Sequence, residues 1–227
     1  MTSITHVIFD VDGLIVDTER CYTETISEIC QRYGKTFTWE IKAKQMGQKE
    51  AVSAKIAIDE LGLPLTVDEY LTEVRAKLEE KLPHAQLLPG AEKLIRHLHK
   101  QKIPIAVATG SDKWGFAKKT APHAELFSLF HHAVCASDDP DVKHGKPEPD
   151  CFLVCAERFP DQPKADKVLV LEDAPNGVEA GIKAGMHVVW VPDPRADQSG
   201  LSGKVDQILE SLEQFVPEKF GLPPYSS

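Results

Sequence analysis

Two aspartates and a glycine follow the first apolar run of the chain, which leads from Val7 to Phe9 into Asp10, Asp12 and Gly13. Valine, isoleucine and phenylalanine bounded by Asp and Gly predict a buried strand that ends in a turn. Ligands bind at the carboxyl ends of parallel strands, where two carboxylates cost desolvation free energy unless a cation joins them. The pair therefore predicts a site for a hard cation such as Mg²⁺.

The same aspartates could instead begin a calcium loop, or simply end a strand. An EF-hand loop needs an acidic or Asn ligand at its fifth position, a glycine at its sixth and a glutamate at its twelfth. Those positions hold Leu14, Ile15 and Cys21, so the EF-hand alternative is excluded. On these residues alone, a strand-ending turn without chemistry stays open.

Polar residues also end or follow three more apolar runs. A hydroxyl with exposed N–H groups at a strand-to-helix turn can bind phosphate oxygens. A lysine between a glycine and a proline has a positive charge whose direction is restricted by the backbone. Two adjacent acids can bind a hard cation. These residues are Thr109 with Gly110, Lys146, and Glu172 with Asp173. Each alone has a plainer explanation, as a helix cap, a solvated lysine or partners of a helix dipole. Together, at one edge of a sheet, they form a set that independent surface residues rarely assemble.

Strand and helix patterns alternate beyond Pro89-Gly90 and would position these residues. Strands are expected at residues 7–9, 103–108, 133–136, 168–171 and 188–191, and helices at 91–101, 113–121, 150–158 and 175–184. Uniformly apolar strands that alternate with helices indicate a parallel sheet covered on both faces. The predicted fold class is therefore α/β, with a doubly wound parallel sheet.

Between residues 18 and 86 the pattern is only helical. Apolar residues recur at helical spacing from Cys21 to Tyr33, and Thr66 followed by Glu69 forms a capping box. We therefore predict a small helical-bundle cap at 18–86, inserted after the first strand of a core formed by 1–17 and 87–227. The cap begins beside the aspartate turn and would close over it. The tail from Pro217 is expected to pack on the surface.

Composition excludes several other classes of function. A net charge of −9 argues against binding to nucleic-acid polymers or acidic membranes. The sequence shows no secretory signal, no apolar run of membrane-spanning length and no C-x-x-C or zinc pattern. We expect a cytoplasmic protein and a monomer, and the net charge still permits a small phosphorylated ligand that is bound by a local lysine or a metal ion.

Four motifs in order resemble the haloacid dehalogenase-like superfamily of phosphotransferases. The sequence DVDG at 10–13 resembles its first motif, Thr109 its second, Lys146 in GKPEPD its third, and EDAPNGVEAGIKAGM at 172–186 its fourth. The resemblance spans the whole chain. It implies a Rossmann-like core with a C1-type cap, and hydrolysis through an aspartyl-phosphate.

The motif residues then take definite roles. Asp10 attacks phosphorus, while Asp12 protonates the leaving oxygen and later accepts a proton from water. Asp12 must therefore start protonated, and we expect drier surroundings for it than for Asp10. Mg²⁺ would be bound by Asp10, the backbone carbonyl of Asp12, Asp173 and, as an additional acid, Glu172. Phosphate would be bound by Gly13, Leu14, Thr109, Gly110 and Lys146. The role of Ser111 is left open.

Other segments of the sequence indicate a narrower class of substrates. PGAEKLIRHL, HGKPEPDCFLVCAERF, LEDAPNGVEA and the carboxyl-terminal FGLPPY resemble members of that superfamily that act on pseudouridine 5′-phosphate, a nucleoside 5′-monophosphate. Such a substrate would be recognised by a cap loop around Lys49, unless that lysine is merely solvated. A sugar- or polyol-phosphate phosphatase, or a β-phosphoglucomutase-like phosphotransferase, is the alternative of the same fold. An inactive binding module would lack some catalytic residues, and all are present.

Overall fold

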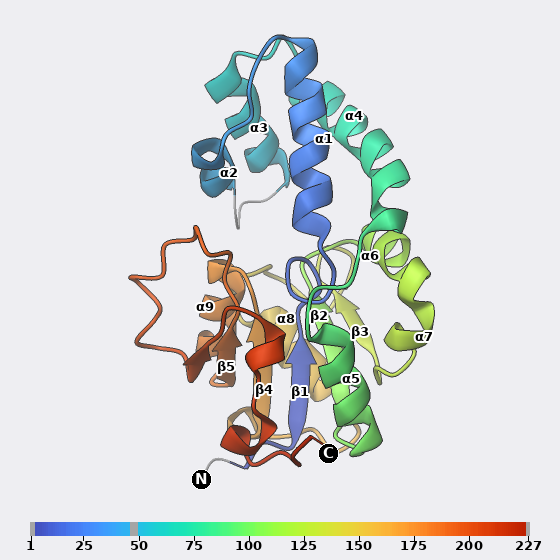
Figure 1. The fold of residues 1–227 in the computed structure, drawn as a ribbon, viewed down its shortest axis with the longest axis vertical. Helices are drawn as coiled ribbons and strands as arrows, with labels where there is room; N and C mark the ends of the chain where they lie inside the picture. Colours follow the sequence, from blue (N-terminus) through green and yellow to red (C-terminus); the bar gives the residue numbers. More distant parts are fainter. Residues whose placement is uncertain (1–2, 46–49, 226–227) are drawn as a thin grey trace.

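A computed structural model describes residues 3–45 and 50–225 and contains one parallel sheet (Figure 1). Across the sheet the strands of this described part lie in the order β3-β2-β1-β4-β5-β6. They are β1 (His6–Phe9), β2 (Ile105–Thr109), β3 (Ala133–Cys135), β4 (Val168–Glu172), β5 (His187–Trp190) and β6 (Gln207–Ile208). The predicted α/β fold is confirmed. Only the short edge strand β6 has no counterpart in the sequence analysis.

Both faces of this sheet are covered, as its uniformly apolar strands require. Side chains alternate along β1, so that Val7 and Phe9 face one apolar cluster and Ile8 the other. The first cluster includes α5 (Ala91–Lys100), and the second includes α8 (Asp150–Glu157) and α9 (Pro175–Lys183). The remaining helices of the core are α6 (Lys113–Thr120) and α7 (Ala124–Phe127).

Four helices follow β1 and lie beyond the carboxyl ends of the strands (Figure 1). They are α1 (Thr18–Arg32), α2 (Trp39–Gln45), α3 (Glu50–Leu61) and α4 (Val67–Lys81). Helix α1 packs on α4, and α3 packs on both α2 and α4. The capping box at the start of α4 is present, with the Glu69 N–H donating to Thr66 Oγ1 at 3.2 Å. We call these four helices the cap, whereas the exact division into core and cap at residues 18 and 86 stays a prediction.

The carboxyl-terminal tail is more deeply packed than expected. A short 3₁₀ turn, Pro217–Phe220, buries Phe220, whose carbonyl accepts a hydrogen bond from the Ile4 N–H at 3.0 Å. Leu222 is buried as well, and the His97 ring bonds the Pro223 carbonyl at 2.9 Å. The tail still lies at the surface, as predicted, since Glu218, Lys219, Gly221 and Pro224 are exposed, but its apolar side chains also complete the core.

Candidate active site

The predicted site residues meet because β1 lies between β2 and β4 in the sheet. Phe9 pairs with Val107 of β2 on one side and with Leu171 of β4 on the other. The next residues along these strands therefore emerge at the same edge. Asp10 follows β1, whereas Thr109 and Glu172 are the last residues of β2 and β4.

A buried lysine joins two of the acids at this edge. Lys146, from the loop between β3 and α8, places its Nζ 2.6 Å from Asp10 Oδ1 and 2.7 Å from Glu172 Oε1. A third bond, 3.0 Å long, reaches the Ala108 carbonyl, so all three protons of the ammonium have acceptors. The lysine side chain is only 6% exposed. This geometry confirms that Lys146 and Asp10 are neighbours, as the sequence predicted.

The charges of this cluster do not balance. Burial raises the pKa of Asp10 to about 7, Lys146 opposes that rise, and Glu172 adds to it. Burial and the neighbouring Glu172 also raise the pKa of Asp173 well above its usual value. Burial alone would lower the pKa of Lys146, but Asp10 and Glu172 hold it well above its ordinary value. The cluster thus holds three carboxyl groups and one ammonium, which pairs with Asp10 and Glu172 but not with Asp173 in the described part of the chain.

A bound divalent cation would supply the positive charge that this cluster lacks. Asp10, Glu172 and Asp173 each offer a ligand oxygen, and these oxygens lie within 4.8 Å of one another. The Glu172 carboxylate is already engaged, because Oε1 accepts from Lys146 while Oε2 accepts from the N–H groups of Asp173 and Ala174 at 2.9 and 3.0 Å. Asp10 and Asp173 are therefore the better direct ligands, and Glu172 chiefly holds Lys146. Hard carboxylate oxygens suit Mg²⁺ or Ca²⁺.

Gly13 allows Asp173 to approach the aspartate turn. Its φ of +79° belongs to the left-handed region that favours glycine. A Cβ at this position would lie 2.2 Å from Asp173 Oδ2, well inside contact distance. The Gly13 N–H donates to the Val16 carbonyl at 3.0 Å, within the turn itself. The expected phosphate contact of this N–H is therefore not available in this conformation.

Asp12 has surroundings opposite to those expected. Thr18 donates to its Oδ1 at 2.7 Å, Thr109 and Ser111 donate to its Oδ2 at 3.1 and 3.0 Å, and Lys119 forms an ion pair with Oδ1. Burial would raise the pKa of Asp12, but Lys119 and the hydroxyls hold it below its usual value. The expected drier site was wrong, because four donors stabilise the ionised carboxylate.

Sequence reasoning missed Lys119 and left Ser111 without a role. Lys119 lies on α6, is fully buried, and donates to Ser111 Oγ at 2.6 Å. A lysine near the end of a short helix carries no sign of burial, because lysines are mostly exposed. Ser111 showed only a hydroxyl two residues after Thr109. Its link to Asp12 depends on the loop geometry after β2.

The remaining predicted phosphate contacts are less completely defined. Thr109 is buried with its hydroxyl on Asp12, and it also accepts a hydrogen bond from the Ser111 N–H at 3.1 Å. Leu14 is buried, whereas Gly110 is exposed at the edge of the site. Lys49, expected to recognise the leaving group, lies outside the described residues. Its role stays a prediction.

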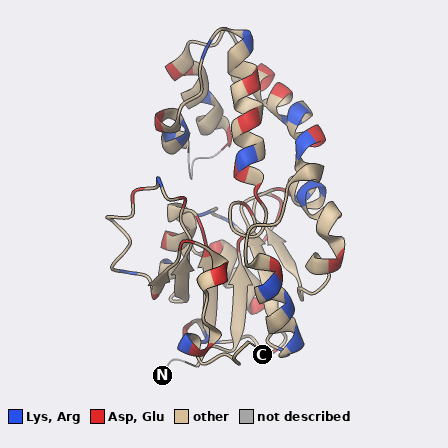
Figure 2. Cartoon of the chain, in the orientation of Figure 1, with Lys and Arg blue, Asp and Glu red and all other residues tan. Residues whose placement is uncertain are grey.

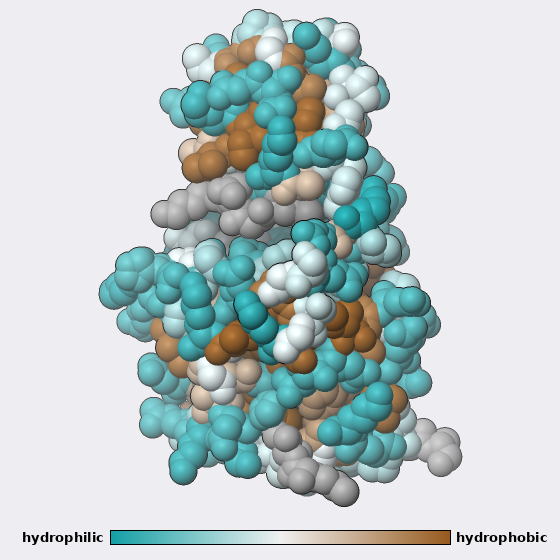
Figure 3. All heavy atoms as spheres, turned by 90° about the vertical axis from the view of Figure 1, so that its left-hand side faces the viewer, coloured by the Kyte–Doolittle hydropathy of each residue, from teal (hydrophilic) through white to brown (hydrophobic). Residues whose placement is uncertain are grey.

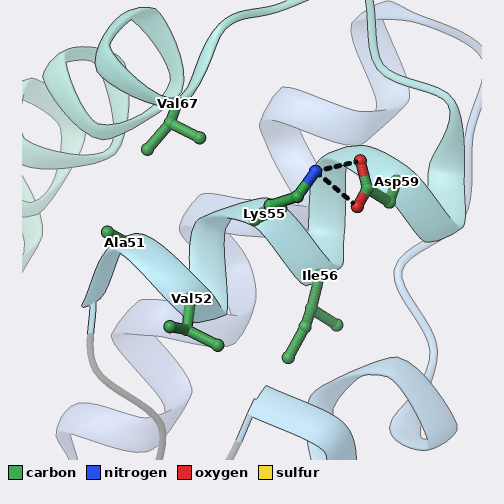
Figure 4. Close-up of a pocket in the computed structure, with 6 residues that line it drawn as sticks. All are labelled: Ala51, Val52, Lys55, Ile56, Asp59 and Val67. Carbon is green, nitrogen blue, oxygen red and sulfur yellow. Dashed lines mark hydrogen bonds and ion pairs between the residues drawn. The ribbon is translucent and has the colours of Figure 1, made fainter.

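A cavity of about 540 Å³ lies on the cap, away from the catalytic cluster. Figure 4 shows its apolar lining from Val52 and Ile56 of α3 and Val67 of α4, with the Lys55–Asp59 ion pair at its side. The same end of the molecule displays apolar surface in Figure 3. None of the described catalytic residues lines this cavity. It is therefore not the site of phosphoryl chemistry.

The comparisons with known proteins agree with this geometry. The profile of the haloacid dehalogenase-like hydrolases matches residues 4–185. The (DL)-glycerol-3-phosphatase 2 of Arabidopsis thaliana is 51% identical over 226 residues, which are 98% of this chain and 93% of that protein. The probable pseudouridine-5′-phosphatase of Drosophila melanogaster is 48% identical, and the match covers 100% of this chain and 97% of that protein.

A solved structure shares the fold. The HAD family hydrolase of Deinococcus radiodurans, determined with bound phosphate and sodium, superposes with a TM-score of 0.82 at 21% identity, covering 99% of this chain and all of the other. The chain therefore belongs to the haloacid dehalogenase-like hydrolases. Within that family it is a phosphatase, an enzyme that hydrolyses phosphoric monoesters. In the described part of the chain, no helix has the length and apolar character needed to cross a membrane.

Proposed function

We propose that this phosphatase requires Mg²⁺ and hydrolyses pseudouridine 5′-phosphate to pseudouridine and phosphate, through an aspartyl-phosphate on Asp10. One observation carries the chemistry: a buried cluster of three carboxylates, two of which, Asp10 and Glu172, bind the ammonium of Lys146. Such a cluster is stabilised when a divalent cation adds positive charge. Asp10, Asp173 and the backbone carbonyl of Asp12 would hold the cation, which would supply the missing positive charge.

Each of the site residues then has its own role in the reaction. Bound Mg²⁺ would supply positive charge that lets a carboxylate approach a phosphate dianion. Asp10, oriented by Lys146, attacks phosphorus through its carboxylate, and the bond from phosphorus to the ester oxygen breaks. Asp12 gives a proton to that oxygen, so the leaving group departs as a neutral alcohol. Asp12 then accepts a proton from water, which attacks phosphorus and releases Asp10 and phosphate.

Proton donation requires Asp12 to bind a proton that its present surroundings disfavour. A phosphate dianion that enters the site brings negative charge, which raises the proton affinity of nearby carboxylates. It also offers new acceptors to the hydroxyls of Thr109 and Ser111, which now donate to Asp12. Substrate binding would therefore move Asp12 toward the protonated state that the reaction needs.

Two observations support a nucleotide as substrate. The fly relative that matches the whole chain is named a probable pseudouridine-5′-phosphatase. Tyr22 of α1 is half-buried and packs against the apolar cluster that contains Phe9 of β1; burial and then the charges of Asp12 and Glu19 raise its pKa. An aromatic ring at this position suits the planar base of a nucleotide, against which it can stack. Glycerol 3-phosphate is the second candidate, favoured by the 51% identity to the Arabidopsis enzyme.

The substrate is tested by comparing kcat/KM for pseudouridine 5′-phosphate, uridine 5′-phosphate and glycerol 3-phosphate, each with Mg²⁺ and with chelator. We expect pseudouridine 5′-phosphate to exceed both others by at least about tenfold, a difference of only ~1.4 kcal/mol. Chelation should abolish all three activities. Faster turnover of glycerol 3-phosphate would reverse the substrate assignment and leave the phosphatase chemistry intact. Conversion of a sugar phosphate to its isomer, without phosphate release, would identify a mutase instead.

Two variants test where the leaving group is recognised. Tyr22→Leu removes the aromatic ring of α1, and Lys49→Ala removes the cation expected in the cap loop. Each should lower kcat/KM for the nucleotide more than for glycerol 3-phosphate, which is too small to reach both groups. Equal losses on the two substrates would assign these side chains a structural or general electrostatic role.

We also propose the cellular location and the oligomeric state of the enzyme. All five cysteines are free thiols, as expected for a protein of a reducing compartment, and we propose the cytoplasm. We also propose a monomer with a small-molecule substrate as its only partner. Cell fractionation and light scattering of the purified protein test these two points.

A further inference from the structure

Lys119 is a buried cation that the proposed reaction does not use. Its side chain has no exposed surface, and its ammonium contacts Asp12 Oδ1 and Ser111 Oγ. Burying an ammonium costs free energy unless acceptors and an opposite charge replace water. The lysine therefore owes its stability in the core to Asp12, the residue placed as general acid and base.

The contacts around Asp12 fix the direction of its carboxylate. Oδ1 is held by Thr18, at the start of the cap helix α1, and by Lys119 from α6. Oδ2 is held by Thr109, at the end of β2, and by Ser111 in the following loop. Three separate parts of the fold thus bind the two oxygens. Rotation of the carboxylate would break contacts on both sides.

We propose that Lys119 is a positioning residue, which aims the Asp12 carboxyl group at the oxygen of the leaving group. The inference rests on the proposed function, because it takes Asp12 as the group that transfers the proton. A misplacement of about 1 Å in a reacting group can cost on the order of 100-fold in rate. Lys119 acts through Asp12 and, by way of Ser111, on the second oxygen of the same carboxylate. The opposing hypothesis is a structural ion pair, which apolar residues could replace without functional loss.

The test uses Lys119→Met, which keeps the length of the side chain and removes its charge. Lys113→Met is the matched control, because Lys113 is exposed at the start of the same helix. Two substrates separate the roles. An alkyl phosphate, glycerol 3-phosphate or the nucleotide, whichever the wild type hydrolyses faster, needs a proton on its leaving oxygen. The aryl ester 4-nitrophenyl phosphate releases a stable anion and needs little help from an acid.

The rate constant of the first turnover is measured by rapid quench for both substrates. For the alkyl phosphate, Lys119→Met should be slower than wild type on the order of 100-fold. The loss for 4-nitrophenyl phosphate should be smaller by at least about tenfold, because its departure does not depend on Asp12. The Kd of inorganic phosphate should change less than about threefold, and Lys113→Met should match wild type.

A double variant asks whether the effect passes through Asp12. In an Asp12→Asn background, the added Lys119→Met change should lower the remaining rate by less than about threefold, because residues that act as a unit are not additive. A full second loss would overturn the proposal. Equal losses on the alkyl and aryl substrates would also overturn it, since a structural defect does not distinguish leaving groups.

The folded state is checked by circular dichroism for every variant. If Lys119→Met does not fold, Lys119→Gln, which keeps a hydrogen-bond donor without the charge, is measured with the same two substrates and the same expectation. A wild-type enzyme inactive on every phosphate ester would remove the proposed function and this inference with it. An active wild type whose Lys119→Met variant resembles Lys113→Met would remove only the role of Lys119.

Discussion

Lysine–carboxylate pairs occur both at the strand ends and on the cap, but in different surroundings. Lys146 is 6% exposed, and its partners Asp10 and Glu172 are 8% and 1% exposed. On the cap, Lys77 of α4 is 31% exposed and binds Glu28 of α1, itself 45% exposed, at 2.7 Å. Figure 2 shows that α1 and α4 carry charges of both signs along their lengths. Water screens pairs of this second kind, which contribute roughly 0 to 1 kcal/mol.

This difference in burial distinguishes the solvated ion pairs of the cap from the buried acids at the strand ends, which can bind a ligand. On the cap, Lys77 and Glu28 have each other and water as partners, so this pair needs no ligand. At the strand ends, three acids lie together in a buried site, and one lysine pairs with two of them, Asp10 and Glu172. When all three acids are ionised, that site carries an excess of negative charge, which bound protons or a bound cation can offset. A bound divalent cation would therefore stabilise an arrangement of acids that destabilises the metal-free fold.

The largest effect on kcat is expected when an aspartate at the strand ends is replaced, in comparison with an aspartate on the cap. Asp10→Asn should lower kcat on the order of 10⁴-fold or more, because an amide cannot attack phosphorus. Asp59→Asn is the control on the cap, where Asp59 is 58% exposed and pairs with Lys55. That variant should keep wild-type kcat. Phosphate release by folded Asp10→Asn near the wild-type rate would exclude Asp10 as nucleophile.

The same lysine substitution in the two regions should have different effects on stability. In the presence of chelator, Lys146→Met should lower the free energy of unfolding by about 3 to 5 kcal/mol, because buried acids lose their only ammonium. Lys77→Met should cost less than about 1 kcal/mol, since Glu28 is exposed. Glu28 also retains Lys81 at 2.8 Å. Urea denaturation measures both. Similar losses would mean that burial does not separate the two regions as described.

A smaller effect is expected from two glycines that share a left-handed backbone. Gly13 and Gly62 have φ of +79° and +60°, but only the Cβ of an alanine at 13 would meet Asp173. Both alanine variants should lose about 1 to 2 kcal/mol of stability through backbone strain. Gly13→Ala should in addition lower kcat on the order of 100-fold, because Asp173 must move. If the two variants keep the same kcat, the close approach at Gly13 has no catalytic importance.

Much of the site could be predicted because its residues are attached to strand ends. Asp10 and Glu172 are fixed by the register of β1 and β4, and the apolar runs that specify these strands are visible in the sequence. Lys146 could be placed because the motifs occur in order. The surroundings of Asp12 could not, because they depend on Lys119, whose burial follows from the packing of α6. The short strand β6 and the buried side chains of the tail likewise depend on contacts distant in sequence.

The central claim is that Asp10 becomes phosphorylated during turnover, and trapping tests it most directly. The enzyme is mixed with substrate and Mg²⁺, quenched in acid and reduced with borohydride, which converts an aspartyl-phosphate into homoserine. Peptide mass spectrometry then locates the changed residue. We predict that homoserine appears at position 10 only when substrate is present, and that it is absent from Asp10→Asn. Homoserine at another aspartate, or rapid phosphate release with none at position 10, would contradict it.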